Sequence, residues 1–354
     1  MKKISFVIAA CLALAGLASC NKTAKVEEPA PEKIIVSVGI ATPQTRVTGV
    51  TAQSGRNDSS DEARIDRVDV FVFNNGVLDG HAAATTSEVS VQCTAGIRQI
   101  YAVVNNPDVA NIVTLNDLLA VESVLAAPAG TDAPTYQMIG NVTETLQKDG
   151  SVTVTVDRLA ARVVIRKITN GFENDAQAAA FKIKSVYLTN VAGSVDLGKT
   201  TDFATTYWYN RRGYEAANNP LGSFNYDEVA DADGTIAKGA SYETAHYFYT
   251  MPNRYDAAVG GTWSPRAVRL LVRAEVAGVL YDYPIAITGI QSNKSYEINE
   301  LVITRVGNTD NGRHDPDDPD DDDEEKPIEG FEQSFTIVVN PWTVELVNGG
   351  TITI

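Results

Sequence analysis

The chain has few of the residues on which catalytic and metal sites are usually built. It contains three cysteines and three histidines in 354 residues, and none of the histidines lies near a cysteine or another histidine in sequence. A zinc site and a Cys/His nucleophilic pair are therefore not expected. The sequence also has no G-x-S-x-G elbow, H-E-x-x-H motif or phosphate loop. We expect no enzyme, no cofactor and no metal, although a pair of carboxylates for glycoside hydrolysis stays open, because the fold sets their spacing.

A basic surface is missing as well. The formal net charge is −16, but nine acidic side chains lie in the run DPDDPDDDDEE between Asp315 and Glu325. Nucleic acid is therefore not an expected partner. The segment 308–330 around this run has almost no apolar residues, which favours an acidic spacer that repels itself into an extended form. A solvated surface loop is the alternative, and calcium capture lacks a fixed ligand spacing.

Long apolar runs occur only at the N-terminus. A basic start is followed by ISFVIAACLALAGLA, which is too short and wrongly flanked for a membrane span and is typical of a secretory signal. Leu17-Ala18-Ser19-Cys20 resembles the lipobox of bacterial lipoproteins, so we expect a signal peptide over 1–19 and a lipid on Cys20. Cys93 then remains alone in the exported chain. No intramolecular disulfide is expected, and Cys93 is expected to be buried in a strand.

Alternating apolar and polar residues recur along the rest of the chain and predict an all-β protein. Asn75-Gly76 is a strong hairpin signal between two such segments. Only the stretch from Leu115 to Leu125 favours a short helix, with Thr114 as its cap. The strand spacing predicts two β-sandwich domains, 47–157 and 158–307, rather than a repeat protein.

The segment IIVSVGIATPQTRVTGV, residues 34–50, predicts a half-buried strand that ends at Pro43 and is followed by a polar turn carrying Arg46. One face of the strand is aliphatic and consists of Ile34, Val36, Val38 and Ile40. The pattern alone leaves two interpretations open. The strand is either a permanent edge strand followed by a solvated arginine, or an element with a further role.

The tail, 331–354, returns to the alternating pattern after the acidic segment and predicts two strands. Its apolar residues are Phe335, Ile337, Val339, Trp342, Val344, Leu346, Ile352 and Ile354. A detached strand edge of this kind is prone to pair with another chain. The alternative is that the tail folds back as the last strand of its own domain.

Several motifs in this order resemble the fimbrillin family, the structural subunits of type V pili of Gram-negative bacteria. They are RVDVFVFNNG, IYAVVNNP, DRLAARVVI, YTMPNR and VNPW, behind a lipobox and ahead of an apolar tail. The resemblance implies two transthyretin-like Greek-key β-sandwich domains and export as an outer-membrane lipoprotein. It also implies a place at the cell surface among other fimbrial subunits.

The resemblance further implies activation by an Arg-specific protease and assembly by donor-strand exchange. Cleavage between Arg46 and Val47 would remove a propeptide, 20–46, together with the strand that carries Ile34, Val36, Val38 and Ile40. The tail residues from Phe335 to Ile354 would then supply the donor strand to another copy.

Alternatives remain open at this stage. Arg56 or Arg64 could be the processed arginine, and the chain could be a pilus tip or anchor subunit instead of a stalk subunit, with a host or bacterial surface receptor. A surface glycan-binding lipoprotein is a second class, because FATTYWYNRRGYEA offers Tyr207, Trp208, Tyr209 and Tyr214 beside two arginines. Packing of these rings inside the protein is the favoured interpretation. DADG, 231–234, resembles part of a calcium loop but lacks its first ligand.

Overall fold

The computed structural model describes residues 32–42, 62–106, 109–125, 136–199, 207–211, 225–255, 265–309, 338–341 and 351–353. Strands dominate these residues, as the alternating sequence predicts, and the helices between them are short. None of the helices in this part of the chain is long and apolar enough to cross a bilayer. The described residues from Lys33 onward belong to one compact unit.

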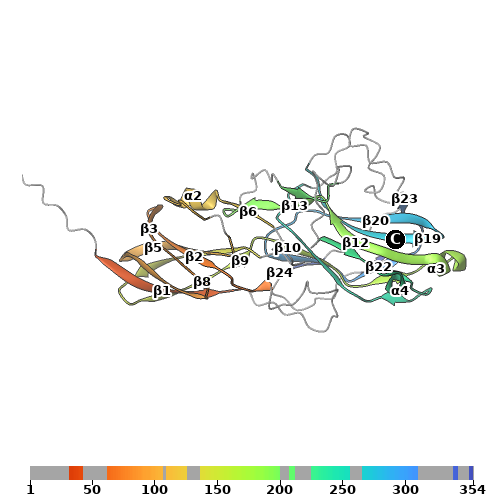
Figure 1. The fold of residues 1–354 in the computed structure, drawn as a ribbon, viewed down its shortest axis with the longest axis horizontal. Helices are drawn as coiled ribbons and strands as arrows, with labels where there is room; N and C mark the ends of the chain where they lie inside the picture. The colour runs from red at the N-terminus through yellow and green to blue at the C-terminus, as the bar shows by residue number, and fades with distance from the viewer. Residues whose placement is uncertain are drawn as a thin grey trace, which may run out of the picture. The chain divides into compact units, whose positions relative to one another are not determined.

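The first strand, β1 (Lys33–Ala41), is the middle strand of a three-stranded sheet. Its antiparallel neighbour is β4 (Glu88–Thr94), and its parallel neighbour is β8 (Ser151–Thr155). Figure 1 shows β1 in red beside β8, which comes much later in the chain. The interpretation of this segment as an edge strand is therefore wrong. Sequence alternation reports which face is buried, but it does not report how many neighbours a strand has.

A five-stranded antiparallel sheet lies against the first one. Its order is β3 (Val77–Ala84), β2 (Val68–Asn74), β5 (Gly96–Val104), β7 (Met138–Leu146) and β9 (Asp157–Arg158). The β2–β3 hairpin turns at Asn75 and Gly76, whose φ angles are 50° and 79°. Both residues therefore adopt the left-handed conformation that this Asn-Gly pair predicts.

Strand β2 is buried on both faces from Val68 to Phe73. Val70, Val72 and Ile100 face the three-stranded sheet and form one core with β1. Phe71 and Phe73, on the opposite face of β2, join a second core that continues into the later half of the chain. β2, in the five-stranded sheet, is therefore packed on both sides, so it gives β1 a well-packed base.

The later half of the chain contains three further sheets. The first has the order β18 (His246–Thr250), β10 (Ala161–Ile165), β21 (Lys294–Ile298) and β24 (Val338–Pro341). The second has the order β17 (Ser241–Tyr242), β11 (Ile168–Asn170), β22 (Glu300–Ile303) and β25 (Thr351–Thr353). The third has the order β16 (Tyr226–Glu228), β12 (Phe181–Thr189), β19 (Val268–Val276), β20 (Val279–Ile287) and β23 (Asn308–Thr309).

Two strand pairs and three short helices complete the described part. The pairs are β6 (Glu122–Val124) with β14 (Ser194–Asp196), and β13 (Val191–Ala192) with β15 (Trp208–Tyr209). The helices are α2 (Leu115–Leu119), α3 (Asp175–Ala180) and α4 (Asp231–Gly234). Thr114 caps α2 as predicted, but the predicted continuation of this helix to Leu125 is wrong. Residues 122–124 pair with β14 instead, so tertiary pairing outweighs the local apolar pattern.

Candidate functional site

The backbone of β1 is bonded along both of its edges. Seven residue pairs join it to β4, from Lys33–Thr94 to Gly39–Glu88, and five join it to β8, from Ser37–Ser151 to Ala41–Thr155. The Ser37 amide donates to the Gly150 carbonyl at 3.1 Å, and the Ile40 amide donates to the Ser87 carbonyl at 2.7 Å. Removing β1 would therefore leave two strands with unpaired edges, separated by the width of one strand.

The inner face of β1 packs into the core between the two sheets. Ile34, Val36, Val38 and Ile40 are buried, whereas the outward-facing Ile35 is 57% exposed. Each buried Val or Ile contributes roughly 1.5–3 kcal/mol, so the row contributes roughly 6–12 kcal/mol before ordering is considered. A domain has a net stability of about 5–15 kcal/mol. The sheet would therefore need a replacement strand if β1 were lost.

The surface under β1 is a groove lined by aliphatic side chains from four strands, which we call the β1 groove. β2 and β5 form its floor, and β4 and β8 form its walls. The residues that line it are Val68, Val70, Val72, Val89, Val91, Cys93, Ile100, Ala102, Val104, Val152 and Val154. None of these lining residues is charged, so their surface suits an apolar strand such as β1.

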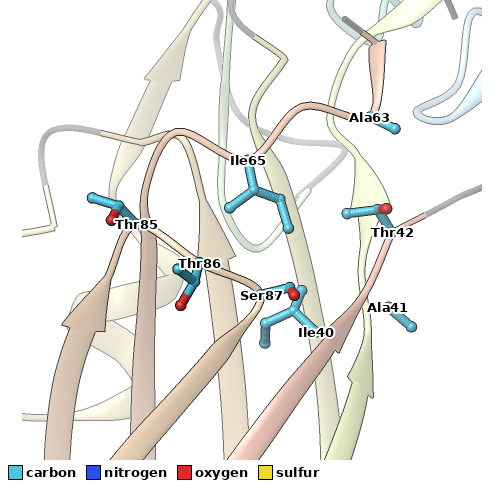
Figure 2. A pocket seen from close by; sticks show the side chains of 8 residues that line it. All are labelled: Ile40, Ala41, Thr42, Ala63, Ile65, Thr85, Thr86 and Ser87. Carbon is cyan, nitrogen blue, oxygen red and sulfur yellow. The ribbon is translucent and has the colours of Figure 1, made fainter. Parts of the chain in front are cut away.

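At the C-terminal end of β1 the β1 groove opens into a pocket of about 620 Å³. Figure 2 shows its lining, which is Ile40, Ala41, Thr42, Ala63, Ile65, Thr85, Thr86 and Ser87. Thr42 takes the next inward position after Ile40 in the alternation of the strand. The pocket lies where the chain leaves β1 toward Pro43 and Arg46 and where it returns at Ala63.

The other end of the β1 groove is fixed by a charged cluster. Asp79 on β3 accepts hydrogen bonds from the Thr94 amide at 2.8 Å, the Thr94 hydroxyl at 2.7 Å and Arg98 Nε at 2.9 Å. Burial acts to raise the pKa of Asp79, but the bonds from Thr94 and Arg98 outweigh it and lower this pKa overall. The cluster therefore holds the end of β4 against β3 and β5.

Cys93 lies directly beside β1 at the same end, opposite Ile34 in the β4 register. Its side chain is fully buried, as predicted. Burial, followed by the negative charge of Asp79, raises the pKa of the Cys93 thiol. The thiol is thus protonated and shielded while β1 is in place.

The two tail strands pair with the later half of their own chain. β24 runs antiparallel to β21, with Val339 opposite Tyr296, and β25 runs parallel to β22, with Ile352 opposite Leu301. Four residue pairs hold β24 and three hold β25, each on one edge only. In these two short segments, therefore, the backbone of the tail folds back on its own chain, as the alternative interpretation predicts. Phe335, Ile337, Trp342, Val344, Leu346 and Ile354 lie outside the described residues.

Other predicted residues also lie outside the described part, namely Cys20, Arg46, Val47 and Arg56. Arg64 lies inside it. Its carbonyl accepts a hydrogen bond of 2.8 Å from Asn105 Nδ2, and its guanidinium forms an ion pair with Asp66 at 3.0 Å. Arg64 therefore belongs to the folded body.

Two of the four aromatic residues of the alternative glycan platform pack inside the protein. Trp208 and Tyr209 are buried, and the Tyr209 hydroxyl donates to the Leu125 carbonyl at 2.6 Å. Tyr207 is partly exposed, and Tyr214 lies outside the described residues. DADG forms helix α4, in which Asp231 pairs with Lys184. No cluster of His, Cys, Asp and Glu in the described ranges could hold a metal ion.

One buried cluster was not predicted from the sequence. Glu62 is 1% exposed and accepts hydrogen bonds from Arg162 Nη1 at 3.2 Å and from the Tyr249 hydroxyl at 3.0 Å. Its own carbonyl accepts from Arg158 Nε at 2.7 Å. The sequence does contain a sign of this cluster. Arg158 and Arg162 lie in the largely apolar segment DRLAARVVI, and buried arginines require acidic partners.

The described sheets and cores define a mostly β protein. Residues 36–159 match the family model described as the major fimbrial subunit protein (FimA). The chain is 25% identical over 213 residues to the major fimbrium subunit FimC of Porphyromonas gingivalis, which covers 54% of this chain and 44% of that protein. The chain thus matches less than half the length of this relative.

Solved structures show the same fold. A candidate cell adhesion protein from Bacteroides eggerthii superposes with a TM-score of 0.57 at 17% identity, covering 91% of this chain and 97% of the other. A fimbrilin from Porphyromonas gingivalis superposes with a TM-score of 0.53 at 16% identity, covering 77% and 91%. The predicted resemblance to the fimbrillin family is confirmed, and this is a family of fimbrial structural subunits, not enzymes.

Proposed function

We propose that the chain is a structural subunit of a cell-surface fimbria, most simply a stalk subunit, and that it polymerises by exchanging β1 for the tail of another copy. The observation that carries this proposal is the position of β1. It is the middle strand of its sheet and fills the β1 groove. It reaches the next described segment only through residues 43–61, which contain Arg46 and Arg56.

The geometry of pairing supports the direction of exchange. β1 is held by backbone pairs on both edges, whereas β24 and β25 are each held on one edge over four and three residue pairs. A strand that moved from the tail position into a vacated β1 groove would gain a second row of hydrogen bonds and an aliphatic floor. The exchange is therefore favourable once β1 has left, and unfavourable while it is in place.

The proposal includes the steps before assembly. The chain would be exported with its signal peptide, 1–19, and acylated at Cys20, which would anchor it in the outer membrane until processing. An Arg-specific protease would then cut between Arg46 and Val47 and release the lipid together with β1. The mature chain would consist of β-sandwich domains 47–157 and 158–309, the acidic spacer 310–330 and the donor segment 331–354, since Asn308 and Thr309 belong to β23. Possible tip and anchor roles differ from the stalk role in whether the tail is used and whether the lipid is kept.

Cys93 offers a direct test, because its thiol is buried beside Ile34. The experiment uses the full chain with Cys11 and Cys20 changed to serine, so that Cys93 is the single thiol. The thiol should be protected before processing, react with a thiol reagent after β1 leaves, and become protected again as polymers form. A thiol that stays unreactive through processing and assembly would contradict the loss of β1, and denatured protein gives the fully reactive reference.

A further inference from the structure

Glu62 is the first described residue after the segment that contains Arg46 and Arg56, and it is among the most buried charged residues of the chain. Both of its carboxylate oxygens lie 3.2 Å from Arg162 Nη1, and the Tyr249 hydroxyl donates to Oε1 at 3.0 Å. Its carbonyl accepts from Arg158 Nε at 2.7 Å. The side chain and the backbone of this one residue are therefore both fixed.

The partners of Glu62 come from three different strands. Arg158 lies on β9, Arg162 on β10 and Tyr249 on β18. Arg162 also donates to Ser295 Oγ at 3.0 Å and lies 3.5 Å from Glu297 Oε1, both on β21. Removing one partner of a buried ion pair leaves the other charge uncompensated, which is strongly destabilising. Glu62 is thus tied to the body by contacts that the protein cannot lose easily.

The residues that follow Glu62 are also held in place. Asn105 binds this segment with its whole side-chain amide, because Nδ2 donates to the Arg64 carbonyl at 2.8 Å and Oδ1 accepts from the Asp66 amide at 2.8 Å. Ala63 and Ile65 line the pocket at the open end of the β1 groove (Figure 2), and Ile65 packs on the core under β1. Arg64, Asp66 and Arg67 are exposed, but a protease also needs backbone that can extend on both sides of the bond it cuts. The hydrogen bonds at the Glu62 and Arg64 carbonyls and the Asp66 amide hold this backbone in place.

We propose that Glu62 is an anchor that limits processing to arginines before it, so that the mature chain keeps Glu62, Ala63 and Arg64. This inference rests on the proposed function and narrows it. Arg46 and Arg56 remain candidates for the processed residue, and Arg64 does not. The anchor also keeps Ala63 and Ile65 in place as one wall of the pocket after β1 has gone, so the opening where a donor strand enters stays formed.

The test uses the full-length protein and a low dose of an arginine-specific protease, with the new N-termini determined by sequencing. The wild-type chain should yield fragments that begin at Val47 or Asn57, and fragments that begin at Ile65 should be at least about tenfold rarer. Glu62→Ala removes the contacts to Arg162 and Tyr249 and should make the bond after Arg64 cleavable at a rate within about threefold of the earlier sites. Glu62→Gln keeps the shape and part of the hydrogen bonding, so its rate of cleavage after Arg64 should be intermediate. This variant provides the test if Glu62→Ala does not fold.

A matched control separates anchoring from general loosening. Val272→Ala creates a cavity in the core on β19, a strand that carries none of the described partners of Glu62, and lowers stability without removing a contact of the anchor. The inference would be overturned if the wild type were cut after Arg64 as fast as after Arg46. It would also be overturned if Val272→Ala and Glu62→Ala, compared at matched melting temperature, raised cleavage after Arg64 equally. A third outcome separates this inference from the proposed function. If the wild type resisted cleavage everywhere between 43 and 64 while Glu62→Ala was cut after Arg64, the anchor would be supported and the proposed processing would fail.

Discussion

Single side chains decide how firmly the β1 groove is held in shape. At one end, Asp79 binds Thr94 and Arg98 and keeps β4 against its neighbours. At the other, Glu62 holds the wall formed by Ala63 and Ile65. Both are carboxylates whose contacts lie just outside an aliphatic surface. Polar contacts at the ends and apolar residues along the length would let the groove keep its form if β1 were replaced by another strand.

The cluster around Asp79 predicts a pH-dependent stability. Its folded pKa is lowered below the value in the unfolded chain, about 3.9, so its contribution is present above about pH 4 and is lost as the pH falls through the folded pKa. Asp79→Asn should lower the free energy of unfolding by about 1.5–3 kcal/mol at pH 7, because hydrogen bonds to a charged group are lost. The difference from wild type should shrink below pH 4 in urea titrations.

Asp66→Asn is the control for this prediction. Asp66 pairs with Arg64 at the surface, where the side chains are 50% and 51% exposed, and such pairs contribute little to stability. A loss for Asp66→Asn as large as that for Asp79→Asn, or a difference for Asp79→Asn that does not change with pH, would contradict the role given to the Asp79 cluster.

Among the strands, β1 and the tail are the two elements whose pairing is expected to change. β1 has neighbours on both edges and a buried inner face, whereas β24 and β25 cover single edges of β21 and β22. Loss of β1 and loss of the tail would therefore expose different edges. Loss of β1 opens the centre of a sheet, and loss of the tail uncovers only its rim.

Deleting residues 331–354 should leave folded monomers that no longer polymerise after processing, because the donor segment is gone. The amides of β21 that pair with β24 should then exchange with deuterium about tenfold faster, since each loses a backbone hydrogen bond. Amides of β19, which has neighbours on both edges, serve as the internal reference and should not change. Polymers that still form from the truncated chain would show that the donor lies elsewhere.

The elements also show what the sequence could predict. The β1 alternation and the Asn75–Gly76 hairpin depend on neighbouring residues and were predicted correctly. The central position of β1 depends on Glu88–Thr94 and Ser151–Thr155, which are distant in sequence, so no local pattern could predict it. The same holds for Glu62, whose partners lie about 100 to 187 positions away. The prediction of helix for the segment 122–124 is wrong because its partner, β14, lies 70 to 74 positions further along the chain.

For the whole molecule, the proposal joins three parts of the chain that are separated in sequence. In this proposal the groove left by the first strand would be the acceptor, the segment 43–61 would carry the cut, and the tail would be the donor. The predicted start of the acidic spacer at 308 is wrong, because Asn308 and Thr309 form β23 and pair with β20. The remaining residues, 310–330, would let the tail reach another copy, since an extended chain of this length spans up to roughly 70 Å. Its charge also favours extension and solubility before assembly.

The central claim is that assembled subunits have lost β1. It is tested most directly by the N-terminal residue of subunits recovered from the polymer at the cell surface and separated by denaturation. The sequence should begin at Val47, or at Asn57 if Arg56 is the processed residue, and no peptide containing Ile34 to Ala41 should be present. Polymeric subunits that still carry this strand in the same chain would contradict strand exchange at the β1 groove.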